Sequence, residues 1–475
     1  MTTTVLVTGA TGFIGRALVQ RLLGTGHRVR ALVRGHARAR ALLGPEVELI
    51  AADGLTAAAA DVDAVINLAG EPIARGRWTA RRKRVLVASR VETTRAVVAA
   101  IRARSAPLPV LISASAIGIY ADGGDRELDE GAAAGRDFAA ELCVAWEREA
   151  LAARGAARRV VLTRLGVVLG RGGGALAPLD RLARFGLGGP VAGGRQWLSW
   201  IHLDDAVAAI TAALTGDLDG PVNVVAPAPV RQVELARALG RLRRRPAFMP
   251  TPRLVLRAVL GESAALVTAS QRVVPAALTR AGFRFAFPTL DAALADLTAA
   301  TDIAIAPADR ATVPTTPYLT RRRPTHVLTA HTRLDRPLAE VFAFFAAAEN
   351  LAVITPPAMG FVITSPTPIA MADGAVIDYR LRALGAPIRW RTVIERWTPG
   401  DRFVDAQERG PYRAWWHEHR FVADGDATIM TDTVYYAAPL GLLGRAMNRL
   451  VIADQLRTIF GHRASVIRHR FGCRG

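Results

Sequence analysis

The sequence predicts two folded parts: an α/β part with a doubly wound parallel sheet, then an α+β part with an antiparallel sheet. Two observations carry this prediction. Up to residue 300, short segments rich in valine, isoleucine and leucine alternate with longer alanine- and leucine-rich stretches, which is typical of a parallel sheet with helices on both faces. After residue 324, strand-like segments follow one another directly and a long amphipathic stretch comes last.

In the first part, the order of the segments predicts each element. Residues 13–23 (FIGRALVQRLL) follow the first strand at once and are expected to form a helix. The strands are short apolar runs bounded by turn residues, expected at residues 5–7, 28–33, 62–68, 110–113 and 160–165.

In the second part, apolar side chains recur at every second residue. In residues 376–382 apolar side chains alternate with charged ones, and two further segments, 415–421 and 428–436, behave in a similar way, which predicts an antiparallel meander. The last helix has one apolar stripe, made of Leu443, Ala446, Leu450, Ala453, Leu456, Phe460, Ala464 and Ile467. We expect this helix to lie across a curved sheet.

The composition indicates a folded, reduced protein. The chain has 475 residues, of which 51% are hydrophobic and 21% charged, so disorder is excluded as its main state. Two cysteines, Cys143 and Cys473, cannot build a disulfide framework. The N-terminus lacks the basic start of a signal peptide, and no apolar run approaches the about 20 residues that span a bilayer. We therefore expect a cytoplasmic protein without stable membrane insertion.

At first sight, the formal net charge of +20 suggests that the protein binds a polyanion. However, Lys83 is the only lysine among the 61 basic residues, and the arginines are scattered along the whole chain instead of forming one patch. A general bias toward alanine and arginine explains the charge more simply. We expect no nucleic-acid partner.

A glycine-rich turn follows the first strand and opens the first helix. Residues 8–15 read TGATGFIG, a spacing that suits a dinucleotide: one glycine for the tight turn, one for approach of the pyrophosphate and one for close helix–strand packing. The strand–turn–helix context makes this assignment specific. The expected cofactor contacts in this turn are Gly9, Thr11, Gly12, Phe13, Ile14 and Gly15.

The residues after the second and third strands bear on the choice between NAD and NADP. An acidic residue about 20 positions after the glycines would bind the ribose 2′-hydroxyl of NAD, whereas arginine favours the 2′-phosphate of NADP. Arg34 stands at that position without an adjacent acid, so we expect NADP, although Arg34 is also compatible with an ordinary surface arginine. Asp53 is placed to reach the adenine or, equally, to cap its loop.

Several segments of the first 300 residues resemble the extended short-chain dehydrogenase/reductase superfamily of epimerase/dehydratase type, in particular an atypical branch with a small C-terminal extension. They are residues 8–15, 67–73 (NLAGEPI), 77–79 (RWT), 113–116 (SASA) and 193–202 (GGRQWLSWIH), with 261–262 and 271–273 in the extension. The resemblance implies an NAD(P)-binding Rossmann fold. It also implies that Leu68, Ala69 and Gly70 pass beneath the cofactor, and that Arg90 approaches its phosphates unless it is a solvated helix arginine.

The usual catalytic pair of this superfamily, Tyr-x-x-x-Lys, is absent. Lys83 has no tyrosine four residues before it, and Cys143 stands in residues 138–147 where the lysine belongs. The candidates that remain for catalysis are Ser115, after a strand, and Tyr120, the only tyrosine of the first part. Each has a structural alternative: Ser115 a loop hydrogen bond, Tyr120 a packed ring. Glu71, which can simply pair with an arginine, and Cys143, which can be a small buried residue, are weaker candidates.

Residues 325–475 resemble the START-like helix-grip superfamily of SRPBCC or polyketide cyclase/dehydrase type. The resemblance lies in residues 349–351 (ENL), 354–357 (ITPP), 388–390 (IRW), 410–417 (GPYRAWWH) and the long last helix. It implies a cavity for a hydrophobic ligand. His417 and His419 point to the same side of one strand, but no third ligand has a convincing spacing, so we expect no metal.

Together these features predict residues 1–300 as the NAD(P)-binding domain, with 240–298 as its extension, 301–324 as a linker and 325–475 as the START-like domain. We expect an NADP(H)-dependent oxidoreductase or epimerase-like enzyme with a small-molecule substrate, fused to a domain that binds a hydrophobic ligand. The alternatives are a non-catalytic NADP sensor or scaffold, and a chain whose chemistry belongs to the second domain as a cyclase or dehydrase. The sequence does not specify an oligomeric state.

Overall fold

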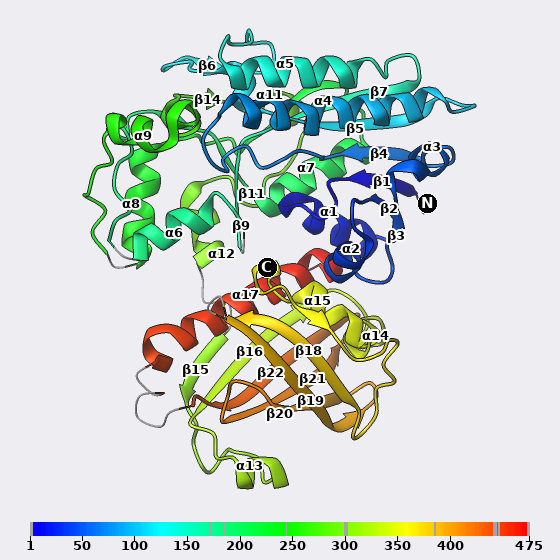
Figure 1. Ribbon diagram of the computed structural model, residues 1–475, viewed down its shortest axis with the longest axis vertical. Helices are drawn as coiled ribbons and strands as arrows, with labels where there is room; N and C mark the ends of the chain where they lie inside the picture. The colour runs from blue at the N-terminus through cyan, green and yellow to red at the C-terminus, as the bar shows by residue number, and fades with distance from the viewer. Residues whose placement is uncertain are drawn as a thin grey trace. The chain divides into compact units, whose positions relative to one another are not determined.

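The computed structural model describes residues 3–171, 173–184, 186–243, 245–298, 303–383, 386–439, 444 and 447–472 (Figure 1). The chain divides into two compact units. The N-terminal unit comprises Met1–His36 and Val47–Ala299, and the C-terminal unit comprises Ala37–Glu46 and Ala300–Gly475. The expected domain boundary between residues 300 and 301 lies outside the described residues.

Seven parallel strands form the sheet of the N-terminal unit, in the order β12-β7-β5-β4-β1-β2-β3. The chain runs outward from β1 through β2 to β3 and then returns to place β4 on the other side of β1. This reversal opens a crevice at the carboxyl ends of β1 and β4, which is where open α/β sheets bind their ligands. The strands are β1 (Thr4–Thr8), β2 (Arg28–Leu32), β3 (Glu48–Ile50), β4 (Ala64–Asn67), β5 (Leu108–Ala116), β7 (Ala157–Leu165) and β12 (Gly220–Val224).

Helices cover both faces of this sheet (Figure 1). On one face α3 (Leu55–Ala59), α4 (Ala80–Arg102) and α5 (Phe138–Leu151) pack together, and on the other α1 (Phe13–Gly24) packs against α7 (Leu203–Thr215). The core under α4 and α5 is made of aliphatic side chains from strands and helices alike. The predicted doubly wound parallel sheet is therefore confirmed, with strand ends within a few residues of those expected. Strand β3 was expected before Asp53 without bounds, and β12 was not predicted.

The remaining elements of this unit are short. Before the C-terminal extension they are η1 (Ala52–Gly54), η2 (Ile117–Tyr120), β6 (Glu127–Leu128), β8 (Val167–Gly170), β9 (Gly173–Gly174), α6 (Leu176–Arg184), β10 (Trp197–Leu198), β11 (Trp200–His202), β13 (Val230–Arg231) and α8 (Gln232–Arg243). The helix α2 (His36–Leu43) follows β2 in the chain, and all of it except His36 is assigned to the C-terminal unit. In the extension they are α9 (Arg253–Leu260), η3 (Gly261–Ala264), α10 (Ala265–Thr268), β14 (Arg272–Val273), α11 (Ala276–Arg280) and α12 (Leu290–Thr298).

The extension is fastened to the segment that carries Tyr120. Strand β14 pairs in parallel with β6, and the Gln271 side-chain amide donates to the carbonyls of Ile117 and Ala121 at 3.0 and 2.9 Å. Because η2 lies between these two carbonyls, the extension holds the turn in which Tyr120 sits.

Eight antiparallel strands form the sheet of the C-terminal unit, in the order β15-β16-β22-β21-β20-β19-β18-β17. They are β15 (Ile303–Pro307), β16 (His326–Leu334), β17 (Val362–Ile363), β18 (Val376–Ala383), β19 (Ala386–Thr398), β20 (Arg402–Arg409), β21 (Ala414–Asp424) and β22 (Ala427–Ala437). The other elements are α13 (Pro317–Arg321), α14 (Leu338–Ala346), η4 (Ala348–Asn350), α15 (Leu351–Ile354), η5 (Pro357–Met359), the π-turn η6 (Asn448–Ile452) and α17 (Ala453–Phe471).

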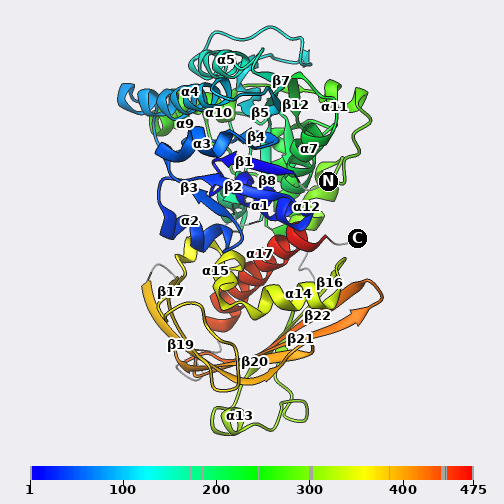
Figure 2. The same cartoon turned by 90° about the vertical axis from the view of Figure 1, so that its right-hand side faces the viewer.

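The long helix α17 lies along the concave side of this sheet, with α14 and α15 beside it (Figure 2). Leu456, Phe460 and Ile467 of its apolar stripe are buried, as predicted. Leu443 and Ala446 of the same stripe lie outside the described residues. The result is a β-rich unit with one helical layer on one face of the sheet.

Part of the expected linker, residues 301–324, is folded. Residues 303–307 form β15, which pairs with β16, and Ile303 joins an apolar cluster with Leu328 and Tyr436. Thr316 caps α13 by accepting from the Leu319 amide at 3.2 Å. Apolar side chains at alternate positions, Ile303 and Ile305, explain why this segment adds to the sheet.

None of the helices in the described ranges is long and apolar enough to cross a membrane.

Candidate functional site

The glycine turn between β1 and α1 has no room for larger side chains. Gly9 has φ of +67°, and a Cβ atom there would lie 2.5 Å from the backbone carbonyl group of Leu68. A Cβ at Gly15 would lie 2.2 Å from the Gly9 carbonyl oxygen. Gly12 is the N-cap of α1 and donates its amide to the Gly9 carbonyl at 2.9 Å. Each glycine is required by close backbone packing, and the helix N-terminus can receive an anion.

The other predicted cofactor contacts lie around this turn. Thr11 is exposed, and Phe13 and Ile14 are half-buried at the start of α1. Arg34 and Asp53 are both exposed, directly after β2 and in η1 after β3. Since β1, β2 and β3 are parallel neighbours, these residues share the carboxyl edge of the sheet with the glycine turn.

On the other side of β1, Leu68, Ala69 and Gly70 follow β4 and are partly or fully exposed. Arg90 of α4 lies against this loop: a Cβ at Gly70 would be 3.1 Å from the guanidinium carbon. Arg90 is buried and lies over the Trp146 ring at 5.1 Å, so the alternative of a solvated helix arginine is wrong. Burial lowers the pKa of Arg90.

The hydrogen bonds of Arg90 go to neutral groups, the Leu86 carbonyl at 3.3 Å and the Ser89 hydroxyl at 3.5 Å. A buried guanidinium with neutral partners, beside a loop that leads into the crevice, is suited to an anion such as a phosphate.

The two predicted catalytic residues belong to one buried network. Ser115 donates its hydroxyl to Glu147 at 2.6 Å, and Tyr120 donates to the side-chain oxygen of Asn223 at 2.7 Å. Arg164 joins them, because it holds both carboxylate oxygens of Glu147 at 2.8 and 2.9 Å and donates to the Tyr120 hydroxyl at 2.9 Å. Burial raises the pKa of Tyr120, so the phenol keeps its proton.

Three members of this network were not predicted from the sequence: Glu147, Arg164 and Asn223. Glu147 lies four residues after Cys143 on α5, so the helix that carries the lysine in the usual pair carries a carboxylate here. The three residues come from α5, β7 and β12, and nothing in their local sequence indicates that they meet.

The weaker candidates, Cys143 and Glu71, have structural roles. Cys143 is buried and burial raises the pKa of its thiol to about 12, so it is not a reactive thiolate at neutral pH. Glu71 pairs with Arg82 at 3.3 Å instead of the nearer arginines in the sequence.

A cavity of about 320 Å³ lies in the C-terminal unit. It is bounded by the sheet, α14 and α17, and most of its lining is aliphatic or aromatic. The predicted faces of two strands contribute to it, with Ile377, Tyr379 and Leu381 from β18 and with Trp415, His417 and His419 from β21. A cavity of this size and polarity is suited to a small apolar molecule.

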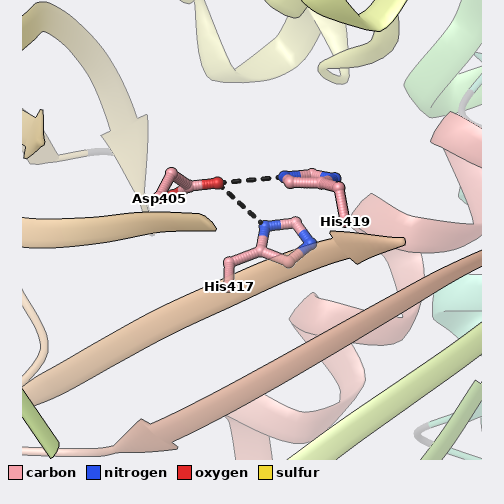
Figure 3. A group of neighbouring side chains, drawn as sticks. All are labelled: Asp405, His417 and His419. Carbon is pink, nitrogen blue, oxygen red and sulfur yellow. Dashed lines mark hydrogen bonds and ion pairs between the residues drawn. The ribbon is translucent and has the colours of Figure 1, made fainter. Parts of the chain in front are cut away.

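One wall of the cavity is polar. Asp405 of β20 lies between His417 and His419 of β21, 3.4 Å from Nδ1 of the first and 3.0 Å from Nε2 of the second (Figure 3). No third group beside the two histidines was predicted from the sequence, and Asp405 is that group. Burial lowers the pKa of His417 to about 4, so this imidazole is neutral at physiological pH.

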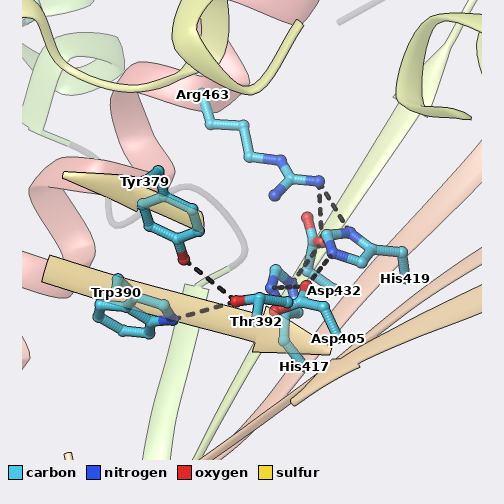
Figure 4. Close-up of polar contacts among 8 residues, drawn as sticks. All are labelled: Tyr379, Trp390, Thr392, Asp405, His417, His419, Asp432 and Arg463. Carbon is cyan, nitrogen blue, oxygen red and sulfur yellow. Dashed lines mark hydrogen bonds and ion pairs between the residues drawn. The ribbon is translucent and has the colours of Figure 1, made fainter. Parts of the chain in front are cut away.

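Behind the histidines, Asp432 of β22 lies 2.9 Å from His417 Nε2 and 2.8 Å from His419 Nδ1 (Figure 4). Arg463 of α17 lies 3.1 Å from the same carboxylate. Nearer the cavity, Thr392 accepts from the Trp390 indole at 3.1 Å and bonds Tyr379 at 3.3 Å. The carboxylates, imidazoles and Thr392 of the polar wall are therefore all engaged in polar contacts, whereas Arg463 Nε has no hydrogen-bond partner among the described residues.

Comparisons with known proteins show which family the N-terminal unit resembles. Residues 5–225 match the model of the NAD dependent epimerase/dehydratase family, and residues 251–297 match the domain of unknown function DUF1731. The epimerase family protein SDR39U1 homolog of Arabidopsis thaliana, described as chloroplastic, is 40% identical over 299 residues, covering 61% of this chain and 85% of the relative.

Solved structures of epimerase-family proteins are similar to the same part of the chain. Human epimerase family protein SDR39U1, crystallised with NADPH, is 36% identical, with a TM-score of 0.57 over 62% of this chain and 99% of that one. The nucleoside-diphosphate sugar epimerase of Corynebacterium glutamicum is 32% identical, with a TM-score of 0.51 over 63% of this chain and 58% of that one. With its glycine turn, its parallel sheet and its C-terminal extension, the chain belongs to the NAD dependent epimerase/dehydratase family.

Proposed function

We propose that the N-terminal unit is an NADP(H)-dependent oxidoreductase or epimerase-like enzyme. The observation that carries this proposal is the tight glycine turn at the reversal of the sheet, where an exposed helix N-terminus can receive a pyrophosphate. Arg34 and Arg90 add positive charge on either side of the turn, which favours NADP over NAD. The NADPH in the human relative supports the same cofactor.

In this proposal the nicotinamide would supply or accept the hydride, and Ser115 and Tyr120 would contact the carbonyl or hydroxyl of the substrate. Burial raises the pKa of Tyr120, so its hydroxyl would hold its proton and serve as a hydrogen-bond donor to the substrate. Arg164 holds Glu147 and Tyr120 in place, so it would act as a positioning residue.

A panel of aldehydes, ketones and sugar nucleotides tests the proposal, with turnover followed by nicotinamide fluorescence. We expect oxidation of NADPH with at least one class. A Ser115→Ala/Tyr120→Phe variant that kept full turnover would remove both residues from the mechanism. NADPH binding without turnover across the panel would favour the sensor, an alternative supported by the internal hydrogen bonds of both hydroxyls.

We predict that Arg34→Asp reverses the cofactor preference. The substitution replaces a cation that can pair with the 2′-phosphate by a carboxylate that repels it, so the ratio of NADPH to NADH affinity should fall by about tenfold or more. Fluorescence titration with both cofactors measures this ratio. Arg158→Asp makes the same charge change near the amino end of β7 and should leave the ratio unaltered; equal ratios in all three proteins would refute the role of Arg34.

We further propose that residues 325–475 form a START-like helix-grip domain that binds a hydrophobic small molecule, with β15 added at the edge of its sheet. The apolar cavity between sheet and long helix supports this proposal. The domain would deliver or retain a substrate or product of the N-terminal unit.

An Ala347→Trp variant should fill the cavity. Ala347 lines the cavity, whereas Ala343, one turn earlier on α14, is exposed. We expect the affinity for a fluorescent fatty acid to fall by about tenfold in Ala347→Trp and to be unchanged in Ala343→Trp. Equal titration curves for the two variants would show that the probe binds elsewhere.

A further inference from the structure

The three side chains on the polar wall of the cavity present their ligand atoms to one point. Asp405 lies directly opposite His417 in the pairing of β20 with β21, and His419 is two residues further along, opposite Phe403. Since side chains alternate along a strand, all three project from the same face of the sheet. One ligand atom from each lies within 4.8 Å of the others.

The distances between these ligand atoms suit an ion. Asp405 Oδ2 is 3.0 Å from His419 Nε2 and 3.4 Å from His417 Nδ1. Ligand atoms bound about 2.1 Å from one ion, at octahedral or tetrahedral angles, are roughly 3.0–3.4 Å apart. Small shifts of the side chains would therefore be enough to coordinate a metal.

In each imidazole, the ring nitrogen that faces away from Asp405 lies beside a second carboxylate. Asp432 lies 2.9 Å from His417 Nε2 and 2.8 Å from His419 Nδ1. Histidines that bind metals almost always direct their second nitrogen to such an acceptor, which fixes the tautomer and the ring orientation. Ring packing holds them too, since the His419 ring stacks on Phe403 with centroids 4.2 Å apart.

The charge of the cluster also favours a cation. Its charged members are the half-buried carboxylate of Asp405, the buried carboxylate of Asp432 and the buried guanidinium of Arg463. Arg463 lies 3.1 Å from Asp432 and 3.0 Å from His419 Nδ1. The carboxylates of the cluster outnumber the guanidinium, and a bound cation would balance the difference.

We propose that Asp405, His417 and His419 form a binding site for one divalent transition-metal ion, held from behind by Asp432 and open toward the apolar cavity. Two imidazoles and one carboxylate select zinc, cobalt or ferrous iron over magnesium and calcium, which prefer oxygen ligands. Three protein ligands leave positions for an oxygen of a cavity ligand, so the site would orient a carboxylate, hydroxyl or carbonyl group of an otherwise hydrophobic molecule.

The test uses the full chain without a histidine tag, stripped with a chelator and titrated with Co²⁺. We expect visible d–d absorption that saturates at one ion per chain and is abolished by Zn²⁺. Asp405→Asn and His419→Gln should each weaken Co²⁺ binding by more than about tenfold. Asp426→Asn and His331→Gln, which change an exposed aspartate and an exposed histidine, should bind as the unaltered protein does.

Because a buried variant can fail to fold, near-ultraviolet circular dichroism without metal accompanies each titration. Asp432→Asn gives a second measurement, since it leaves the three ligands intact and should weaken binding by about 10–100-fold. The proposal is overturned if the stripped protein takes up no Co²⁺, or if the folded ligand variants bind it as tightly as the two surface variants do. In either case the cluster is a hydrogen-bonded ion network only.

Discussion

A Gly9→Ala variant is expected to bind NADP(H) about a hundredfold more weakly than the unaltered protein, equivalent to about 2.7 kcal/mol. The added Cβ would lie 2.5 Å from the Leu68 carbonyl group and 2.8 Å from the Ala69 amide nitrogen. These are backbone atoms of the loop beneath the expected cofactor site, so they cannot rotate away as a side chain can. Relief of the overlap requires the glycine turn and the β4 loop to separate. Fluorescence titration with NADPH measures the loss.

Gly26→Ala is the matched control for this prediction. Gly26 has φ of +82°, and nothing lies within 4 Å of the position of its Cβ. It therefore carries the conformational cost of a left-handed alanine, about 1 kcal/mol, without the overlap. Urea unfolding of both variants separates stability from binding. If Gly9→Ala bound NADPH as tightly as Gly26→Ala does, the turn would not be the dinucleotide site.

Arg164→Met should destabilise the N-terminal unit by about 3–5 kcal/mol, because it leaves the Glu147 carboxylate buried without its partner. The two side chains are only 10% and 8% exposed and make a two-pronged ion pair. The Tyr120 hydroxyl would also lose a donor. Chemical denaturation followed by circular dichroism measures the free energy of unfolding.

Two further variants test whether an unpaired buried charge causes the loss of stability in Arg164→Met. Glu147→Gln/Arg164→Met removes both charges and should be more stable than Arg164→Met alone, as a double-mutant cycle would show. Arg95→Met breaks another ion pair of α5, with Glu149, but Arg95 is 61% exposed, so the loss should be below about 1 kcal/mol. Similar losses for Arg95→Met and Arg164→Met would contradict the buried-charge explanation.

Local patterns made the first fold and its glycine turn predictable. Strand, turn and helix are contiguous in residues 4–24. A Cβ at Gly12 or Gly15 would meet backbone atoms of the turn itself, which is a local constraint. Apolar runs of strand length also indicated the parallel sheet. Residues 303–307 were missed because proline and threonine nearby suggested a linker, while the pairing with β16 that makes them a strand is not visible in the segment itself.

The networks around the candidate catalytic and polar residues were not predictable in the same way. Glu147 and Arg164 meet only because α5 packs beside β5 and β7. Asp405 faces His417 because of the register between β20 and β21, which depends on the turn between them. One local signal was available: Phe403 and Asp405 are two residues apart in a strand-like segment, and this spacing places an aromatic ring and a carboxylate on the same side of a strand.

The strand β15 has a consequence for how the chain is divided in the laboratory. A fragment that began at residue 325 would contain the whole segment that we propose as a START-like domain but would leave β16 as an edge. Its backbone groups along residues 326–330, now paired with β15, would be free to recruit a strand from another molecule. The other edge is β17, which has only two residues. A C-terminal fragment intended to remain monomeric should therefore begin before residue 303.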